Sequence, residues 1–209
     1  ISYSGASAQG TILSMTENQA QRLIVGISGA SGIAYGIETL KQLRTAGIES
    51  HLIVSKAAMQ TLKQESSMSY AELQDLADVH YSNNDIGAAI ASGSFKTAGM
   101  IVAPCSIRSM SEIASGFSAS LLSRAADVVL KERRRLVLLV RETPLHAGHL
   151  QSMLELTRMG GIIMPPVPAF YTKPQSIEDI VAQTVARALD LFAIETDKLQ
   201  RWEGQGTSV

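Results

Sequence analysis

The chain has 209 residues and a formal net charge of −1, with 18 Lys and Arg residues against 19 Asp and Glu residues. Because this balance provides no basic field for nucleic acid or for an anionic membrane, it favours a small-molecule substrate. Cys105 is the only cysteine, which excludes an internal disulfide and a multi-cysteine zinc site and fits a cytoplasmic location. The apolar runs are too short to cross a bilayer.

The first 21 residues are mostly small or polar and lack the basic-then-apolar pattern of a secretory signal. We expect residues 1–21 to form a flexible leader. Residues 22–209 predict a single domain that includes a C-terminal helix, because this length and a hydrophobic content of 45% suffice for one α/β core.

Short apolar segments alternate with longer segments of helical periodicity along the chain. The predicted strands are Arg22–Ile27, Ser50–Val54, Val79–Tyr81, Met100–Ala103, Leu136–Val140 and Gly161–Met164. The predicted helices span Gly32–Thr45, Lys56–Glu65, a short segment from Ser69 to Ala77, a charged segment that begins near Arg124, and a long segment from Ser176 past Phe192. This alternation predicts an α/β fold, a doubly wound, Rossmann-like parallel sheet within three αβα layers.

The first predicted strand leads into a glycine-rich turn, Gly26–Gly32, with the sequence GISGASG. These glycines allow a tight turn and a close approach to an anion at the start of the next helix, so a phosphate-bearing cofactor fits here. The spacing differs from G-x-G-x-x-G, which leaves a plain strand-to-helix turn as the alternative. Ser31, just before the helix, is either an N-cap or a ligand contact.

Polar residues also follow other predicted strands, at the edge where open α/β sheets bind ligands. Ser55 follows the second strand as either a helix cap or a ligand contact, and a turn with two hydroxyl groups and a cation, Pro104–Ser109, follows the fourth. Cys105 in this turn is expected to be a packed residue rather than a nucleophile, because no His lies near it in the sequence. Arg141 and Glu142 directly follow the fifth strand, where chemistry is expected.

Several other chemistries lack their sequence signatures. His146 and His149 are three residues apart, but no H-E-x-x-H arrangement and no second cysteine complete a ligand set, so no metal site is predicted. The chain contains neither a G-x-S-x-G elbow nor a phosphate-loop signature. These absences argue against a serine hydrolase and a nucleotide hydrolase.

Six segments in order give the chain a resemblance to the UbiX-type flavin prenyltransferases (the UbiX/Pad family), and the match extends from Arg22 to Trp202. They are GISGASG at 26–32, VSKAA at 54–58, PCS at 104–106, RAADVVLKERR at 124–134, LVLLVRETP at 136–144 and PPVPAFYTKPQS at 165–176. The resemblance implies an enzyme that joins the dimethylallyl group of dimethylallyl monophosphate to N5 and C6 of reduced FMN without a metal. The prenylated FMN would serve a UbiD-type decarboxylase, here in ubiquinone synthesis. The family's homododecamers place their sites at subunit junctions.

The resemblance also implies roles for individual residues. The residues implied to bind FMN are Gly29, Ala30, Ser31, Ser55, Ser106, Ile107, Arg108, Ser109, Arg124 and Arg141. Those implied to hold the prenyl phosphate are Lys131, Arg141, Tyr171 and Arg187. Fixed cations would stabilise the negative charge that develops on the leaving phosphate, so Lys131 also counts as catalytic. Glu142 is implied to transfer protons through Ser31 and the bound phosphate, whereas a departure from the family pattern at residues 64–67 leaves the role of Glu65 open.

Simpler interpretations remain for several of these residues. Arg124 and Lys131 could simply lie on the solvated face of a helix. Arg187 could extend from an apolar helix surface to water, and Tyr171 could pack within its loop. Two rival functions are also open. One is an FMN-dependent cysteine decarboxylase, which is disfavoured because its P-x-M-N-x-x-M-W segment is absent, and the other is a non-catalytic flavin carrier or accessory subunit of a decarboxylase.

Overall fold

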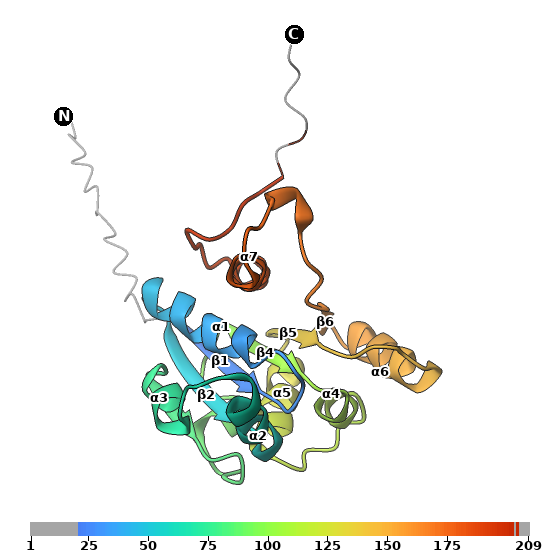
Figure 1. The fold of residues 1–209 in the computed structure, drawn as a ribbon. Coiled ribbons are helices and arrows are strands. Elements are labelled where there is room, and N and C mark those ends of the chain that lie inside the picture. The colour runs from blue at the N-terminus through green and yellow to red at the C-terminus, as the bar shows by residue number, and fades with distance from the viewer. Residues whose placement is uncertain (1–20, 203, 205–209) are drawn as a thin grey trace, which may run out of the picture.

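The computed structural model describes residues 21–202 and residue 204, which form a parallel sheet between two layers of helices (Figure 1). Its six strands lie in the order β3-β2-β1-β4-β5-β6. They are β1 (Arg22–Ile27), β2 (Glu49–Val54), β3 (Val79–Tyr81), β4 (Gly99–Cys105), β5 (Arg135–Val140) and β6 (Ile162–Ile163). The order reverses between β1 and β4, which in a doubly wound sheet is the place where a ligand binds.

The central strands are apolar on both faces because helices cover both. All seven residues of β4 are buried, and so are the last five of β5. Alternate β1 side chains enter different cores: Leu23 packs in one apolar cluster and Ile24 in the other. Such strands specify a parallel sheet rather than a half-exposed one.

The helices divide between these two cores. They are α1 (Ile33–Thr45), α2 (Lys56–Glu65), α3 (Tyr70–Asp75), α4 (Ile107–Ala114), α5 (Leu121–Lys131), α6 (Ala147–Arg158) and α7 (Ile177–Asp190), with single 3-10 turns η1 (Ala89–Ala91) and η2 (Phe170–Thr172). Side chains from α1, α2, α3 and α7 pack in one cluster, and those from α4, α5 and α6 pack in the other. The predicted doubly wound αβα fold is therefore confirmed.

The element boundaries correct a few details. The last helix was expected to run past Phe192, but α7 ends at Asp190, and Ala193 shortly after it has a positive φ of 57° that no helix interior adopts. The sixth strand is shortened to Ile162–Ile163, since only these residues pair with β5. Residues 1–20 of the predicted leader lie outside the described part of the chain.

Candidate functional site

Three helices begin around one cleft at the carboxyl edge of the sheet. The cleft has a volume of about 290 Å³, and its wall includes Ser55, Ser106 and Ser120. These residues are the N-caps of α2, α4 and α5, and each side-chain oxygen accepts a hydrogen bond from a backbone N–H of the first turn. Since a helix N-terminus carries a partial positive charge, this convergence is suited to an anion. The N–H groups of Leu121, Leu122 and Ser123 in α5 are already paired within the protein, so α5 contributes its dipole rather than free donors.

The alternatives left open for Ser55 turn out to be compatible. Its hydroxyl oxygen accepts from the Ala58 N–H at 3.1 Å, so it is a helix cap, and the residue also lines the cleft. A hydroxyl that accepts through oxygen still has its own proton to donate to a ligand.

The first loop packs closely against the loop after β2. A Cβ atom added to Gly29 would lie 2.3 Å from the Cβ of Ala57, a distance that real atoms do not adopt. Glycine is thus required by the close approach of two loops, and not only by a ligand. Ala30, next in the chain, is 8% exposed. Its side chain therefore packs in the core, and only its backbone can contribute to a ligand site.

Ser28 connects the first loop to the loop after β4, and sequence reasoning missed it. Its buried hydroxyl donates to the Pro104 carbonyl at 3.0 Å and accepts from the Ser106 N–H at 2.7 Å. Its position directly after a doubly buried strand could have predicted this role, because a buried hydroxyl needs hydrogen-bond partners.

Asn83 was also missed. Its side-chain oxygen accepts from the Leu122 N–H at 3.0 Å, its carbonyl accepts from the Leu121 N–H at 2.8 Å, and the residue lines the cleft. It follows the short strand β3, so the rule that ligand sites lie at strand ends applied here as well.

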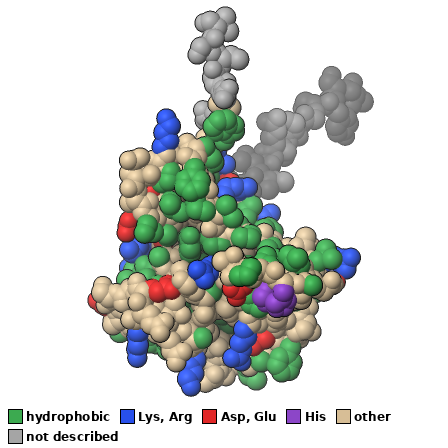
Figure 2. All heavy atoms as spheres, turned by 45° about the vertical axis from the view of Figure 1, so that its right-hand side comes forward, with side chains coloured by type: hydrophobic (Ala, Val, Ile, Leu, Met, Phe, Trp, Pro, Cys, Tyr) green, Lys and Arg blue, Asp and Glu red, His purple; other side chains and the backbone are tan. Residues whose placement is uncertain are grey.

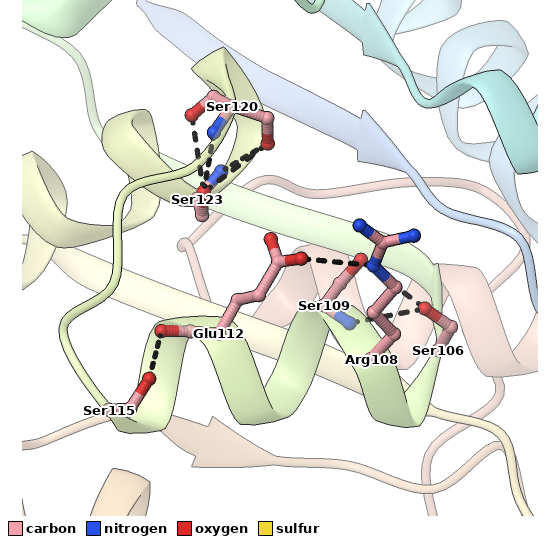
Figure 3. Close-up of polar contacts among 7 residues, drawn as sticks. All are labelled: Ser106, Arg108, Ser109, Glu112, Ser115, Ser120 and Ser123. Atoms are coloured by element: carbon pink, nitrogen blue, oxygen red, sulfur yellow. Dashed lines mark hydrogen bonds and ion pairs between the residues drawn. The ribbon is translucent and has the colours of Figure 1, made fainter.

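The next wall of the cleft is one face of α4. Figure 3 shows Arg108 and Glu112 side by side on this helix, with the Arg108 Nε donating to Glu112 Oε1 at 3.1 Å. Ser106 donates to the Ser109 hydroxyl at 3.2 Å. The contact with Glu112 uses only the Nε of Arg108, so both terminal nitrogens of Arg108 remain for a ligand. A guanidinium fork matches the geometry of a phosphate group.

Two further predicted flavin contacts lie on the same helices. Ile107, the first residue of α4, packs partly against the second core cluster. Arg124, in the first half of α5, forms an ion pair with Asp127 at 3.0 Å.

The N-terminus of α1 differs from the other three because the protein's own carboxylate occupies it. Glu65 accepts from the Gly32 N–H at 2.8 Å and from the Ile33 N–H at 3.0 Å. The N-cap is Gly32, with a φ of 104° that favours glycine, so the N-cap alternative for Ser31 is wrong. Burial alone would raise the pKa of Glu65, but the Ser31 side chain, these two amides and the charge of Arg141 lower the pKa on balance.

Arg141 and Glu142 lie at the carboxyl end of β5, as predicted. The Arg141 N–H donates to the Cys105 carbonyl at 3.0 Å. Burial raises the pKa of the Tyr35 hydroxyl in α1, and the positive charge of Arg141 opposes that rise. Glu142 is exposed and accepts from the Thr143 N–H at 2.9 Å, and within the described residues no hydrogen bond joins it to Ser31.

One chain does not bring the predicted prenyl-phosphate residues together. Lys131 ends α5 just before the amino end of β5, where it pairs with Glu132 at 2.7 Å. Arg141 lies at the opposite end of this strand, roughly 20 Å away at about 3.3 Å per residue. Arg187 lies in the last turn of α7 and pairs with Asp190 at 2.9 Å. The expectation of one cationic group is therefore not met within a single chain.

Tyr171 lies on η2, in the arm that precedes α7. Its hydroxyl donates to the Gln200 carbonyl at 3.1 Å, and its ring meets Trp202 edge-on with 5.7 Å between centroids. The residue is half-exposed, so its contacts do not amount to buried loop packing.

The remaining candidates have structural explanations. Cys105 is fully buried, and burial raises the pKa of its thiol to about 12, as expected of a packed residue. His146 caps α6 by accepting from the Gly148 N–H, and its ring lies 3.6 Å from that of His149. Over residues 21–202 and 204, no group of three or more His, Cys, Asp or Glu residues could hold a metal ion. In the same part of the chain, no helix is both long and apolar enough to span a membrane.

A doubly wound sheet with a ligand cleft at its switch point is typical of nucleotide-binding and flavin-binding proteins, and comparison with known proteins selects the flavin-binding class. The family described as "Flavoprotein" matches residues 12–189. The flavin prenyltransferase UbiX of Escherichia coli K12 is 56% identical over 187 residues, which cover 88% of this chain and 99% of that protein. The enzyme of the same name from Neisseria meningitidis serogroup B is 55% identical over 184 residues, or 88% of this chain and 97% of that protein.

Solved structures give the same result. AnUbiX (PadA1), solved in complex with FMN and dimethylallyl pyrophosphate, has a TM-score of 0.88 and 49% identity, over 90% of this chain and all of that one. A dodecameric FMN-dependent UbiX-like decarboxylase from Escherichia coli O157:H7 has a TM-score of 0.86 and 46% identity, over 88% of this chain and all of that one. The chain belongs to the flavoprotein family and, within it, to the UbiX-type flavin prenyltransferases. It is therefore a transferase.

Proposed function

We propose that this enzyme transfers the dimethylallyl group of dimethylallyl monophosphate to N5 and C6 of reduced FMN. In this reaction the allylic C–O bond breaks as N5 bonds to that carbon, and the prenyl C=C bond is consumed as its far carbon bonds to C6. Of the protons displaced from N5 and C6, one leaves with phosphate and the other adds to the remaining alkene carbon. The single observation that carries the proposal is the cleft formed by three helix N-termini at the strand ends. Its donor set fits the phosphate of FMN, and AnUbiX was solved with FMN and dimethylallyl pyrophosphate.

In this proposal the residues around the cleft hold the flavin. The cleft wall offers hydroxyl and amide donors from Gly29, Ser55 and Ser109, and Arg108 offers its guanidinium. Ala30 and Ser31, the next two residues of the first loop, would add further donors. Ile107 and Arg124 would complete the flavin site. FMN, once bound, supplies the nucleophilic N5 and C6 atoms, and the protein positions them against the allylic carbon.

Arg141, Lys131, Tyr171 and Arg187 hold the prenyl phosphate in the proposal. Fixed cations interact more strongly with the leaving oxygen as negative charge develops on it, so they would lower the activation barrier without a metal. Glu142 and Ser31 would remove protons at the N5 and C6 steps. The Ser31 side chain helps to lower the pKa of Glu65, so Glu65 is the carboxylate that we expect next to Ser31 in the proposed site.

The separation of the cations within one chain supports a site shared between subunits. Lys131 and Arg141 lie at opposite ends of β5, so a second copy is needed to bring a lysine to Arg141. Figure 2 shows hydrophobic side chains on the face that carries α6 and the C-terminal part of the chain, and Leu150, Val167 and Phe170 are more than half exposed. Such a surface fits a homo-oligomer, and the Escherichia coli O157:H7 relative is dodecameric. We propose a homododecamer whose product serves a UbiD-type decarboxylase in ubiquinone synthesis.

The test is anaerobic incubation of the enzyme with reduced FMN and dimethylallyl monophosphate, followed by mass spectrometry of the released flavin. An added C5H8 unit with release of phosphate, in a chelator-treated reaction, is the expected result. Dimethylallyl pyrophosphate run in parallel identifies the preferred donor. Unchanged FMN in a flavin-loaded protein would contradict the proposal and favour a carrier.

The cysteine decarboxylase alternative has only fold-level support. A solved PPC decarboxylase mutant has a TM-score of 0.56 and 19% identity over 72% of this chain, so it shares the fold alone. Its test is release of CO2 from a cysteinyl substrate by the FMN-loaded enzyme.

A further inference from the structure

We propose that Gln183 is a positioning residue that holds Tyr171 in place for the prenyl substrate through the backbone of Gln200. This inference rests on the proposed function, because it takes Tyr171 to be a ligand of the prenyl phosphate. Residues Gln200–Trp202, which we term the C-terminal clasp, are the means by which Gln183 acts.

The side-chain amide of Gln183 pairs with one backbone position at both of its ends. Its Nε2 donates to the Gln200 carbonyl at 2.9 Å, and its Oε1 accepts from the Gln200 N–H at 2.9 Å. A two-point contact of this kind fixes both the position and the orientation of residue 200.

The same carbonyl also anchors Tyr171. The Tyr171 hydroxyl donates to the Gln200 oxygen at 3.1 Å, and its own oxygen lies 3.5 Å from Gln183 Nε2. The Gln200 carbonyl thus holds Gln183 of α7 and Tyr171 of η2 together. Tyr171 is 48% exposed, so the apolar core does not fix it and these polar contacts must.

The burial of Gln183 makes the arrangement specific. It is 6% exposed, whereas exposed glutamines are the rule on a helix surface. A buried amide is costly unless its donor and acceptor are both paired, so the folded protein strongly favours the state in which the clasp is docked.

The clasp reaches the other proposed phosphate ligand of this region as well. Arg201 forms an ion pair with Asp190, the same carboxylate that binds Arg187 at 2.9 Å. When Arg187 turns toward a substrate phosphate, Arg201 still neutralises Asp190. Docking of the clasp therefore positions Tyr171 and also lowers the free-energy cost of separating Arg187 from Asp190.

The chain contains a built-in reporter of the docked state. Trp202 is the only tryptophan, and its ring packs edge-on against Tyr171 at 5.7 Å. Tryptophan emission of the FMN-free oligomer, excited at a wavelength that tyrosine does not absorb, therefore reports on the clasp. We expect Gln183→Ala to shift the emission of Trp202 to longer wavelength, because the ring loses its contact and becomes more exposed.

The kinetic test compares Gln183→Ala with Gln151→Ala. Gln151 is an exposed glutamine of α6 whose amide also makes a hydrogen bond, to Glu155 at 2.6 Å. We expect Gln183→Ala to raise KM for dimethylallyl monophosphate about tenfold, with kcat within about twofold and FMN affinity unchanged, since it loses binding and not chemistry. Gln151→Ala should leave all three unchanged.

Two further variants keep the outcomes distinct. Arg201→Ala alters an exposed side chain that cannot disrupt the core, and we expect it to raise the same KM about threefold. Tyr171→Phe tests the proposed function itself. If Tyr171→Phe leaves KM unchanged, the assigned role of Tyr171 fails; if it raises KM while Gln183→Ala and Arg201→Ala do not, the positioning inference is overturned.

Discussion

The flavin cleft and the prenyl-phosphate cations are built in opposite ways. One chain forms the cleft, because Ser55, Ser106 and Ser120 begin three helices that converge on it. The cations are dispersed: Arg141 lies at one end of β5 and Lys131 lies near the other. The difference indicates that a fold can supply an anion cleft from its topology alone, whereas the proposed cluster of cations would need a second copy of the chain, because the two ends of one strand cannot meet.

The largest effect on turnover should come from removing either of the two separated cations, Lys131 and Arg141. Lys131→Ala and Arg141→Ala should each lower turnover about a hundredfold or more, because each removes a cation from the leaving phosphate. If the site joins Lys131 of one subunit with Arg141 of another, oligomers assembled from a mixture of both variants should recover about a quarter of the wild-type sites. No recovery above the separate variants would mean that both residues act within one chain.

A second catalytic variant separates chemistry from binding. Glu142→Gln should lower turnover about a hundredfold while FMN binding is retained, because the amide cannot accept a proton. Flavin titration and single-turnover product formation measure the two effects separately. Unimpaired product formation would remove Glu142 from the mechanism.

Damage to the cleft should appear as a loss of stability. In Gly29→Ala the new Cβ would meet Ala57 at 2.3 Å, so the free energy of unfolding should fall by about 1–3 kcal/mol. Gly87→Ala is the control, since its added Cβ has only the Asp85 side chain at 3.6 Å. Urea denaturation of the two variants measures the difference, and equal stability would show that the two loops can separate freely.

The phosphate end of the cleft can be tested by comparing FMN with riboflavin. Arg108→Ala should weaken FMN binding about tenfold and leave riboflavin binding unchanged, because only FMN carries the phosphate. Arg158→Ala is the matched control, as that arginine pairs with Glu155 on α6 away from the cleft. An equal loss for both flavins would place Arg108 against the ring system instead.

The smallest effect concerns Glu65, whose carboxylate occupies the fourth helix N-terminus. The pKa of Glu65 is lowered in the folded state, so its stabilisation is present above the unfolded pKa and is lost as pH falls through the folded pKa. Glu65→Gln should reduce the free energy of unfolding by about 0.5 kcal/mol at neutral pH and flatten its decline under acidic conditions. Unfolding curves at pH 7 and pH 3 test this, and an unchanged slope would indicate that Glu65 contributes no charge-dependent stability.

The fold was largely predictable because the signals that determine it are local. Runs such as Leu136–Val140 are apolar throughout, which only a doubly covered parallel strand requires, and a cap of α2 was one of the two roles expected of Ser55. Ser106 was expected as a hydroxyl in a turn, and its role as the cap of α4 was not predicted. The pairing of Glu65 with the N-terminus of α1 was not predictable, because 33 residues separate it from Gly32 and no spacing rule connects them. The separation of Lys131 from Arg141 could have been predicted, because a helix that leads directly into a parallel strand ends at the amino edge of the sheet, opposite the carboxyl edge where Arg141 lies. The position of Arg187 could not, since no strand in the described part of the chain follows α7 to fix where that helix ends.

The hydroxyl of Ser28, between Pro104 and Ser106, has a consequence for the kinetics of ligand binding. Together with the contact between Gly29 and Ala57, it fixes the loops after β1, β2 and β4 to one another before any ligand arrives. The entropy of ordering these loops is therefore lost during folding and not at the moment of association. Flavin should enter a receptor that is already shaped for it, with an association rate governed by diffusion and orientation rather than by a slow rearrangement of the protein.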